Sequence, residues 1–306
     1  MMRTETTFST ELKSKTLLFS RDTIKLMRIP FSYFLMPVFF FALSQASNID
    51  FKNAILCFII LHLFVYPASN GYNSYMDNDD GSIGGLKNPP QPTKKLFYLS
   101  LVFDSIGLLL CLFINIQFFL SVLAYILASR AYSYKGIRLK KFPIAGFLTV
   151  VIFQGAFTFW MVYNAFGREA FPVNIESGLV LAACSFLIGG VYPLTQIYQH
   201  EADKKSGDIS ISCMLGYNGT FIFSTLMFLC ANALLFFYFY SNGKFLNFLL
   251  FQIFLFPVVI YFIRWFMKVI KDKKEASFEN TMNMNLMAST LLNICFIVLL
   301  IINLLK

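Results

Sequence analysis

Long apolar runs dominate this sequence, and they restrict the chain to the folds that a lipid bilayer permits. Run after run reaches the roughly 20 residues that a helix needs to cross a hydrocarbon core about 30 Å thick. The runs lack the strict alternation of membrane-spanning strands, and lipid permits only helices and closed barrels. Charged residues make up 13% of the chain, whereas a soluble domain carries about 25%. We therefore predict an all-α, polytopic membrane protein.

Nine stretches qualify as transmembrane helices. The predicted spans are Phe31–Ser47, Ala54–Tyr75, Leu96–Ile114, Phe118–Tyr134, Phe142–Phe166, Ile175–Tyr198, Tyr217–Tyr240, Phe245–Val269 and Met284–Leu305. We see no soluble linker or repeat between them, so residues 1–306 are predicted to form a single domain. The segment 1–30 is polar and basic with interleaved apolar residues. We expect it to lie along the cytoplasmic interface and not to act as a cleavable signal peptide.

Positive charges are divided very unevenly between the two sets of loops. One set holds 21 Lys or Arg residues and comprises the N-terminal segment and loops 77–95, 130–141, 199–216 and 264–283. The other set holds only Lys52, Arg168, Lys244 and Lys306. Because cytoplasmic loops are enriched in Lys and Arg, we predict a cytoplasmic N-terminus and an outer C-terminus. We expect an integral protein of a bacterial cytoplasmic (inner) membrane.

Neither the net charge nor the cysteines indicate a different class of protein. The charge of +9 is explained by basic loops that face anionic lipid, so we expect no nucleic-acid partner. Five of the six cysteines fall in apolar runs, and no two have the spacing of metal ligands. We interpret them as small buried apolar residues.

The second span ends in polar residues that a lipid-facing helix would not carry. Asn73, Asp77 and Asp80 are spaced i, i+4 and i+7, which places them on one stripe of a helix. Three acceptor or like-charged side chains on one stripe repel one another. A cation must compensate them if they share a site.

The sixth span ends in a second stripe of the same kind. It consists of Tyr192, Gln196, Gln199 and Asp203, with His200 and Glu201 beside it and Asp208 in the following loop. Both acidic ends fall on the predicted cytoplasmic side. Mg²⁺ prefers oxygen ligands and typically binds through one or two carboxylates together with substrate phosphates. A single Asp at a helix end is usually only solvated, but two acidic stripes on one side favour a metal site.

The basic loop 130–141 lies on the same predicted side. It contributes Arg130, Lys135, Arg138, Lys140 and Lys141 next to Tyr132 and Tyr134. With a metal on one side and these cations on the other, the site can hold a diphosphate. Taken alone, the loop is better explained as a signal of membrane topology.

Two further polar residues lie inside predicted spans. Asp104 is about two turns inside the third span, and a carboxylate there is costly unless it faces the bundle interior or a polar cavity. Its role is either structural or directed at a substrate. His62, in the second span, is more often an interhelical hydrogen-bond partner than a ligand.

The chain resembles the UbiA superfamily of intramembrane prenyltransferases. That family has nine transmembrane helices around a central cavity open to the cytoplasmic side and to lipid, and Asp-rich motifs after helices two and six. The first motif, N-D-x-x-D-x-x-x-D, appears here as N-S-Y-M-D-N-D-D-G, starting at Asn73. The second, D-x-x-x-D, appears as Q-H-E-A-D, starting at Gln199. Asn73, Asp77 and Asp203 match, whereas Ser74, Gly81 and Gln199 replace acidic positions.

The resemblance implies transfer of a polyprenyl group from a prenyl diphosphate to a hydrophobic or aromatic acceptor at the membrane. Asp77, Asp203 and Lys135 would be catalytic, and Asp77, Asp80 and Asp203 would hold Mg²⁺. The diphosphate would bind to Asn73, Tyr132, Arg138, Gln199 and Lys204.

Two other functions remain open at the level of sequence. The first is a transporter that uses buried polar residues as an ion path, although its polar groups would be expected near the midplane. The second is a non-catalytic relative that binds an isoprenoid lipid or a partner, which the missing motif acids leave open. Asn73, Asp77, Asp80, Asp203 and the Lys residues remain, and they favour retained activity.

Overall fold

The computed structural model describes residues 19–78 and 81–305, and these residues form a bundle of helices. The elements are α2 (Arg21–Met27), η1 (Ile29–Leu35), α3 (Met36–Gln45), α4 (Phe51–Ile59), η2 (Ile60–Val65), α5 (Tyr66–Asp77), α6 (Lys94–Cys111), α7 (Ile116–Ser133), η3 (Leu139–Lys141), α8 (Pro143–Val151), η4 (Ile152–Phe157), α9 (Thr158–Phe166), α10 (Ile175–Gln196), η5 (Ile197–Gln199), α11 (His200–Ser206), α12 (Ile211–Ser241), α13 (Phe245–Lys271), η6 (Lys273–Glu275) and α14 (Phe278–Leu304). Within the described residues the only β-type pairings are two isolated bridges.

The prediction of an all-α polytopic membrane protein is confirmed. Eight helical segments within the described residues are long and apolar enough to cross a membrane. The third predicted span coincides with α6, whose 18 residues include Lys94, Lys95 and Asp104 and are therefore less apolar. The count of nine spans and the orientation stay predictions. Most of the predicted interfacial lead-in, residues 1–18, lies outside the described residues.

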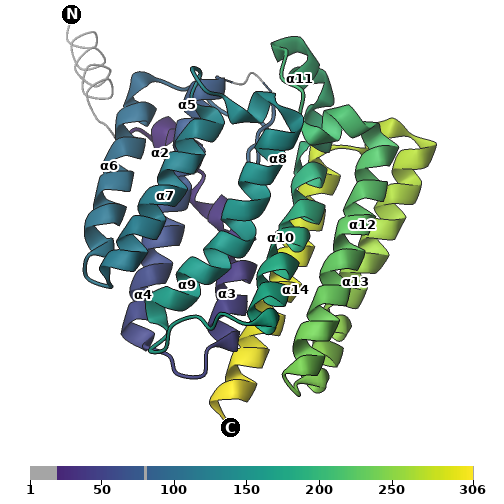
Figure 1. The fold of residues 1–306 in the computed structure, drawn as a ribbon. Coiled ribbons are helices and arrows are strands. Elements are labelled where there is room, and N and C mark those ends of the chain that lie inside the picture. Colours follow the sequence, from purple (N-terminus) through teal and green to yellow (C-terminus); the bar gives the residue numbers. More distant parts are fainter. Residues whose placement is uncertain (1–18, 79–80, 306) are drawn as a thin grey trace, which may run out of the picture.

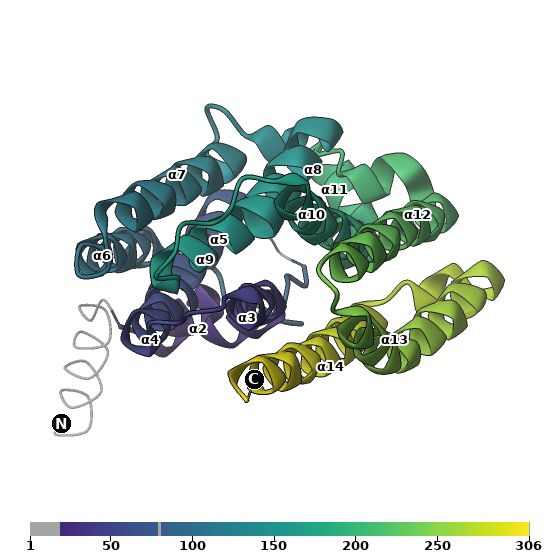
Figure 2. The same cartoon turned by 60° about the horizontal axis from the view of Figure 1, so that its bottom comes forward.

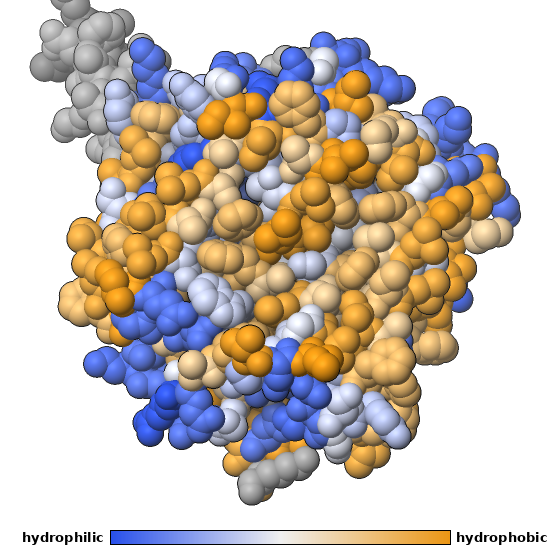
Figure 3. Space-filling model, in the orientation of Figure 1, coloured by the Kyte–Doolittle hydropathy of each residue, from blue (hydrophilic) through white to orange (hydrophobic). Residues whose placement is uncertain are grey.

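The long helices run side by side between two ends of the molecule. In Figure 1, α11 and the labelled end of α5 lie at the top, and the C-terminal end of α14 lies at the bottom. Turning the molecule shows α6 and α7 on one side and α13 and α14 on the other (Figure 2). Figure 3 shows hydrophobic residues over the middle of the visible face and hydrophilic residues gathered towards both ends. This distribution suits a protein that spans a bilayer.

Two of the long helices contain a π-helical segment that the sequence did not predict. Segment η2 joins α4 to α5, and η4 joins α8 to α9. A π-helical turn leaves backbone groups without their usual partners, and Ser185 of α10 satisfies two of them near η4. Its hydroxyl donates to the Val151 carbonyl at 3.2 Å and accepts from the Ala156 amide at 3.2 Å. Such segments are frequent at functional sites.

The contact between η4 and α10 leaves no room for a side chain at Gly155. A Cβ atom there would lie 2.6 Å from the Ser185 Cα and 2.9 Å from the Cys184 carbonyl oxygen. Because backbone atoms cannot rotate away, Gly155→Ala is expected to destabilise the protein by about 1–3 kcal/mol. Gly178→Ala, on α10, has open space around it and is the matched control. Thermal unfolding of both variants in detergent measures the difference, and equal midpoints would contradict the close packing.

Asp104 and His62 both lie inside the bundle. Asp104 is 6% exposed and pairs with Arg130 of α7, whose guanidinium stacks over the Tyr72 ring at 3.9 Å. The His62 ring is fully buried, and its Nδ1 lies 3.2 Å from the Ser32 carbonyl oxygen. In the structure, both side chains therefore make contacts between segments of the bundle. The cysteines form no disulfide among the described residues, and four of the six are buried.

Candidate active site

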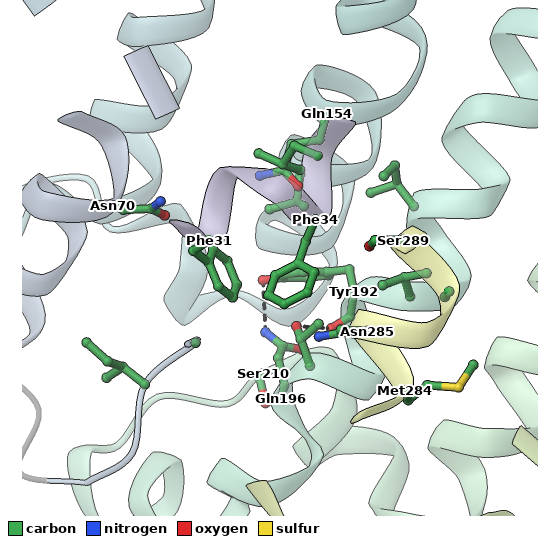
Figure 4. A pocket seen from close by; sticks show the side chains of 18 of the residues that line it. Phe31, Phe34, Asn70, Gln154, Tyr192, Gln196, Ser210, Met284, Asn285 and Ser289 are labelled. Carbon is green, nitrogen blue, oxygen red and sulfur yellow. Dashed lines mark hydrogen bonds between the residues drawn. The ribbon is translucent and has the colours of Figure 1, made fainter. Parts of the chain in front are cut away.

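A cavity of about 1200 Å³ runs through the bundle and collects most of the predicted site residues. Its lining comes from elements along nearly the whole chain, from η1 to α14. Figure 4 shows Phe31 and Phe34 among polar side chains of this lining, including Asn70, Tyr192 and Gln196. The described charged residues of the lining are Arg28, Asp77, Lys140, Glu201, Asp203, Lys205 and Asp208.

Asp77 is the last residue of α5, so its carboxylate lies where the helix opens into a loop. The helix ends because Asn78 adopts a left-handed conformation with a φ of 52°. The Lys140 ammonium lies 2.5 Å from the Asp77 Oδ1 atom and 3.6 Å from the Asp208 Oδ2 atom. The Asp77 side chain is 6% exposed, and at such burial an unpaired carboxylate would be costly. Lys140 thus compensates two carboxylates that come from different segments.

Asp203 reaches the same cavity from α11. Its Oδ2 atom accepts a hydrogen bond of 2.7 Å from the Ser210 hydroxyl. Gly207 ends α11 with a φ of 73°, a conformation that glycine adopts without strain. The chain then turns back, and the Asp208 amide donates to the Asp203 carbonyl at 3.0 Å. The Asp203 carboxylate interacts electrostatically with Lys140, Asp208 and Asp77.

Arg138 holds the basic loop against the turn after α11. Its guanidinium donates to both carboxylate oxygens of Asp208, at 2.7 Å and 3.2 Å. Two parallel bonds of this kind fix orientation as well as distance. Arg138 itself has a left-handed φ of 48°, and η3, which carries Lys140, follows directly. The contact with Asp208 therefore helps to place Lys140 beside Asp77.

The remaining polar groups near the aspartates form short hydrogen-bonded chains. The Asn73 amide donates to the Ser133 hydroxyl at 2.9 Å. The hydroxyls of Tyr132 and Tyr192 are 2.5 Å apart, and the Gln196 amide donates to Tyr192 at 2.8 Å (Figure 4 shows the second contact). The Gln199 amide donates to the Ser82 carbonyl at 3.2 Å. These bonds connect α5 to α7, α7 to α10, and η5 to the loop after α5.

The structure divides the residues predicted from the sequence into three groups. The cavity lining includes Asn73, Asp77, Tyr132, Gln199 and Asp203. Arg138 lies outside the lining and pairs with Asp208, whereas Lys135 and Lys204 are exposed and also lie outside it. Asp80 falls outside the described residues. The roles of all these residues stay predictions.

Sequence reasoning gave no site role to Lys205, Asp208 or Ser210, although Asp208 was noted in the loop after the second stripe. All three follow Asp203 closely and line the same cavity. Gly207 was a usable signal, because a glycine after a short polar helix indicates a reversal of the chain that returns the next residues to the site. Lys140 was noted as part of the basic loop, but its contact with Asp77 depends on the left-handed Arg138, which the sequence does not reveal.

The donor set fits a divalent cation that also binds a substrate. No group of three or more His, Cys, Asp or Glu residues among those described is arranged to hold a metal ion by itself. Mg²⁺ does not require such a group, since it typically uses one or two carboxylates and completes its shell with water and phosphate oxygens. Asp77 and Asp203 provide two carboxylates in one cavity, and the side-chain carbonyls of Asn73 and Gln199 are further oxygen donors.

The chain is similar to one family of known proteins. A sequence profile described as the UbiA prenyltransferase family matches residues 34–287. A UbiA homologue from Archaeoglobus fulgidus bound to DMAPP and Mg²⁺ is 19% identical, with a TM-score of 0.65 over 91% of this chain and 99% of that one. A UbiA homologue from Aeropyrum pernix K1 is 19% identical, with a TM-score of 0.66 over 89% and 98%. A digeranylgeranylglyceryl phosphate synthase is 20% identical, with a TM-score of 0.60 over 91% and 97%. No curated protein matches the chain significantly.

Proposed function

The chain belongs to the UbiA prenyltransferase family, and from this premise we propose that it transfers a prenyl group from a prenyl diphosphate to a hydrophobic or aromatic acceptor within the membrane. One observation carries the proposal most directly. Asp77 and Asp203, from segments more than a hundred residues apart, line one cavity together with Lys140. Cations and carboxylates at one end of a largely apolar space match a substrate that has a charged head and an apolar tail.

The polar end of the cavity is the proposed binding site for the diphosphate. Asp77 and Asp203 would hold Mg²⁺, as would Asp80, and the bound ion would neutralise the charge of the leaving diphosphate. Lys140 would add a second cation, and Asn73, Tyr132 and Gln199 would orient the phosphate oxygens. Arg138 acts through Asp208 by fixing the loop. Lys135 and Lys204 are exposed and lie outside the lining. The catalytic role predicted for Lys135 and the diphosphate-binding role predicted for Lys204 therefore require their loops to close further around a bound substrate.

The proposed reaction breaks the bond between the allylic carbon and the diphosphate oxygen, and the electron pair leaves with the diphosphate. The allylic cation then accepts an electron pair from the acceptor, which loses a proton. Aromatic rings stabilise cations, and Phe31, Phe34 and Tyr192 line the cavity near the polar end. Their apolar surroundings also exclude water, which would otherwise capture the cation.

Metal removal tests this proposal directly. The purified protein in detergent is expected to release inorganic diphosphate from geranyl diphosphate when supplied with Mg²⁺ and a lipid extract that contains the acceptor. EDTA should reduce the release to background, and excess Mg²⁺ should restore it, because the two carboxylates cannot accept an anionic head without a metal. Mass spectrometry of the extract would identify the prenylated product. Diphosphate release that is unaffected by EDTA would contradict the proposed role of Mg²⁺.

The two alternative functions make different predictions for the same preparation. The described charged residues of the lining lie at or near the ends of helices, at positions 28, 77, 140 and 201–208. A transporter usually binds its substrate near the midplane of the membrane instead. Flux through liposomes without chemistry would favour a transporter. Binding of geranyl diphosphate without turnover over a broad acceptor panel would favour a non-catalytic relative.

A further inference from the structure

Four uncharged polar side chains line the cavity inside the bundle. They are Gln154 of η4, Asn232 of α12, and Asn285 and Ser289 of α14. We refer to these four residues as the polar belt. Figure 4 shows three of them, Gln154, Asn285 and Ser289, among the side chains of the lining. The polar belt therefore offers hydrogen bonds to a ligand without offering a charge.

The polar belt begins a short distance from the aspartates. The ring of Phe278, the first residue of α14, contacts the ring of Tyr198 in η5 with centroids 5.4 Å apart. The start of α14 thus lies beside the segment that leads to Asp203. Asn285 and Ser289 lie about 10 Å and 16 Å further along the helix axis, at 1.5 Å per residue. A prenyl diphosphate anchored at the aspartates would place its reacting carbon at the beginning of the belt.

The two members of the belt on α14 have no partner in the fold. Asn285 is 5% exposed and Ser289 is 6% exposed, and neither side chain forms a hydrogen bond with any other residue that the structure describes. Buried polar groups are nearly always hydrogen-bonded. Apolar side chains are also compatible with this face of α14, since Leu292 and Phe296 line the same cavity. The unpartnered pair is therefore best explained by a ligand.

The other two members of the belt are held in place by neighbouring helices. A hydrogen bond joins the side chain of Gln154 to that of Tyr125 in α7. The Asn232 amide donates to the side-chain oxygen of Gln252 in α13 at 3.1 Å. An amide has both donors and an acceptor, so one such bond leaves each side chain able to bind a ligand as well. The belt thus presents positioned polar groups from three segments of the bundle.

A prenyl tail does not account for the polar belt. Hydrocarbon forms no hydrogen bonds, and polar groups buried against it are costly. A second ligand with polar groups explains the belt, and a cavity of about 1200 Å³ has room for two ligands. An anion among these uncharged side chains would lose its hydration without gaining a cation. Arg28, which also lines the cavity, already donates to the carbonyls of Gly84 and Asn70, at 3.1 Å each.

We propose that the polar belt binds the hydroxyl or carbonyl groups of the acceptor, and that the acceptor is an uncharged molecule such as a phenol, a quinol or an alcohol. The inference rests on the proposed function, because it takes the second ligand to be the prenyl acceptor. The Asn285 amide donates to a carbonyl or accepts from a hydroxyl, and the Ser289 hydroxyl does the same. Both are positioning residues that hold the acceptor beside the allylic carbon.

The charge of the acceptor is tested first. The lipid extract that supports diphosphate release is divided by anion exchange into an uncharged and an anionic fraction, and each is given to the purified protein with geranyl diphosphate and Mg²⁺. The uncharged fraction is expected to support the release seen with the whole extract, and the anionic fraction only background. Equal or greater release with the anionic fraction would overturn the proposal and leave the proposed function standing. If the whole extract supports no release, the proposed function itself fails.

Two variants then test the belt residues. Asn285→Leu and Ser289→Ala each remove one hydrogen bond to the acceptor, so each should need about tenfold more of the uncharged fraction for half-maximal release. The KM for geranyl diphosphate should stay within about twofold, because the belt does not touch the diphosphate. Asn293→Leu is the matched control, since Asn293 is a buried amide of the same helix, 5% exposed and outside the lining. It should change neither quantity.

Thermal unfolding separates a positioning role from a structural one. A buried side chain without a partner does not stabilise the fold, so Asn285→Leu should unfold at or above the midpoint of the unaltered protein when no acceptor is present. A lower midpoint for Asn285→Leu with an unchanged response to the uncharged fraction would assign Asn285 to the fold and overturn the proposal. Half-saturating amounts that are the same for both belt variants, Asn293→Leu and the unaltered protein would also overturn it.

Discussion

Asp77→Asn is expected to lower Mg²⁺-dependent turnover of geranyl diphosphate about a thousandfold, which corresponds to about 4 kcal/mol of lost transition-state stabilisation. The substitution keeps the size of the side chain but removes one of the two described carboxylates, Asp77 and Asp203, that are proposed to hold Mg²⁺ in the cavity. A metal that stabilises developing charge contributes several kcal/mol. The Asp77→Asn substitution also leaves Lys140 with Asp208 as its acidic partner, at 3.6 Å.

Asp272→Asn is the matched control for loss of a carboxylate. Asp272 is exposed, caps the short helix η6 and lies outside the cavity lining. The initial rate of diphosphate release is measured over a range of Mg²⁺ concentrations for both variants, with thermal unfolding as a check on folding. Turnover by folded Asp77→Asn within a few-fold of the unaltered protein would remove Asp77 from the proposed mechanism.

Arg130→Leu is expected to destabilise the protein by about 3–5 kcal/mol, because it leaves a buried carboxylate without its partner. The Asp104 and Arg130 side chains are 8% and 15% exposed, and the pair connects α6 to α7. Arg130 also stacks on Tyr72 of α5, so its loss removes a contact among three helices. The measurement is the midpoint of unfolding in detergent, by heat or by added SDS.

The double variant Asp104→Leu/Arg130→Leu separates charge from packing. Replacing both partners of a buried ion pair by apolar residues is often neutral or stabilising. We therefore expect the double variant to unfold close to the unaltered protein, well above Arg130→Leu. If the double variant is as unstable as the single one, stacking on Tyr72 and not the unpaired charge is the main source of stability.

The sequence predicted the transmembrane helices best, because the lipid bilayer imposes the same requirement on every residue of a span. Lipid requires long apolar helices, so the predicted span Phe245–Val269 agrees closely with α13 and the predicted span Ile175–Tyr198 falls within the helices α10 and η5. Helical periodicity also placed Asn73 and Asp77 on one stripe, and both line the cavity. Patterns of this kind are local, and they survive folding because neighbouring turns of a helix stay neighbours.

The parts that escaped prediction depend on contacts between distant segments. The sequence placed Asp104 inside a span but could not name Arg130, 26 positions later, as its partner. Lys135 and Lys140 are equally basic and five residues apart, yet only Lys140 reaches the cavity. The difference arises from the turn at Arg138, which is fixed by Asp208, 70 positions later. Composition and periodicity contain no information about such pairs.

Segment η2 has a consequence for how this helix should be aligned with those of its relatives. A π-helical turn accommodates one extra residue, and one residue corresponds to about 100° of rotation about the helix axis. The direction in which every later side chain of α5 points, that of Asp77 included, depends on that extra residue, which lies at least 12 positions upstream in Ile60–Val65. Removing one residue from Ile60–Val65 would rotate the acidic stripe away from the cavity and leave every motif letter unchanged. Alignments of this helix should therefore permit a single-residue gap ahead of the motif.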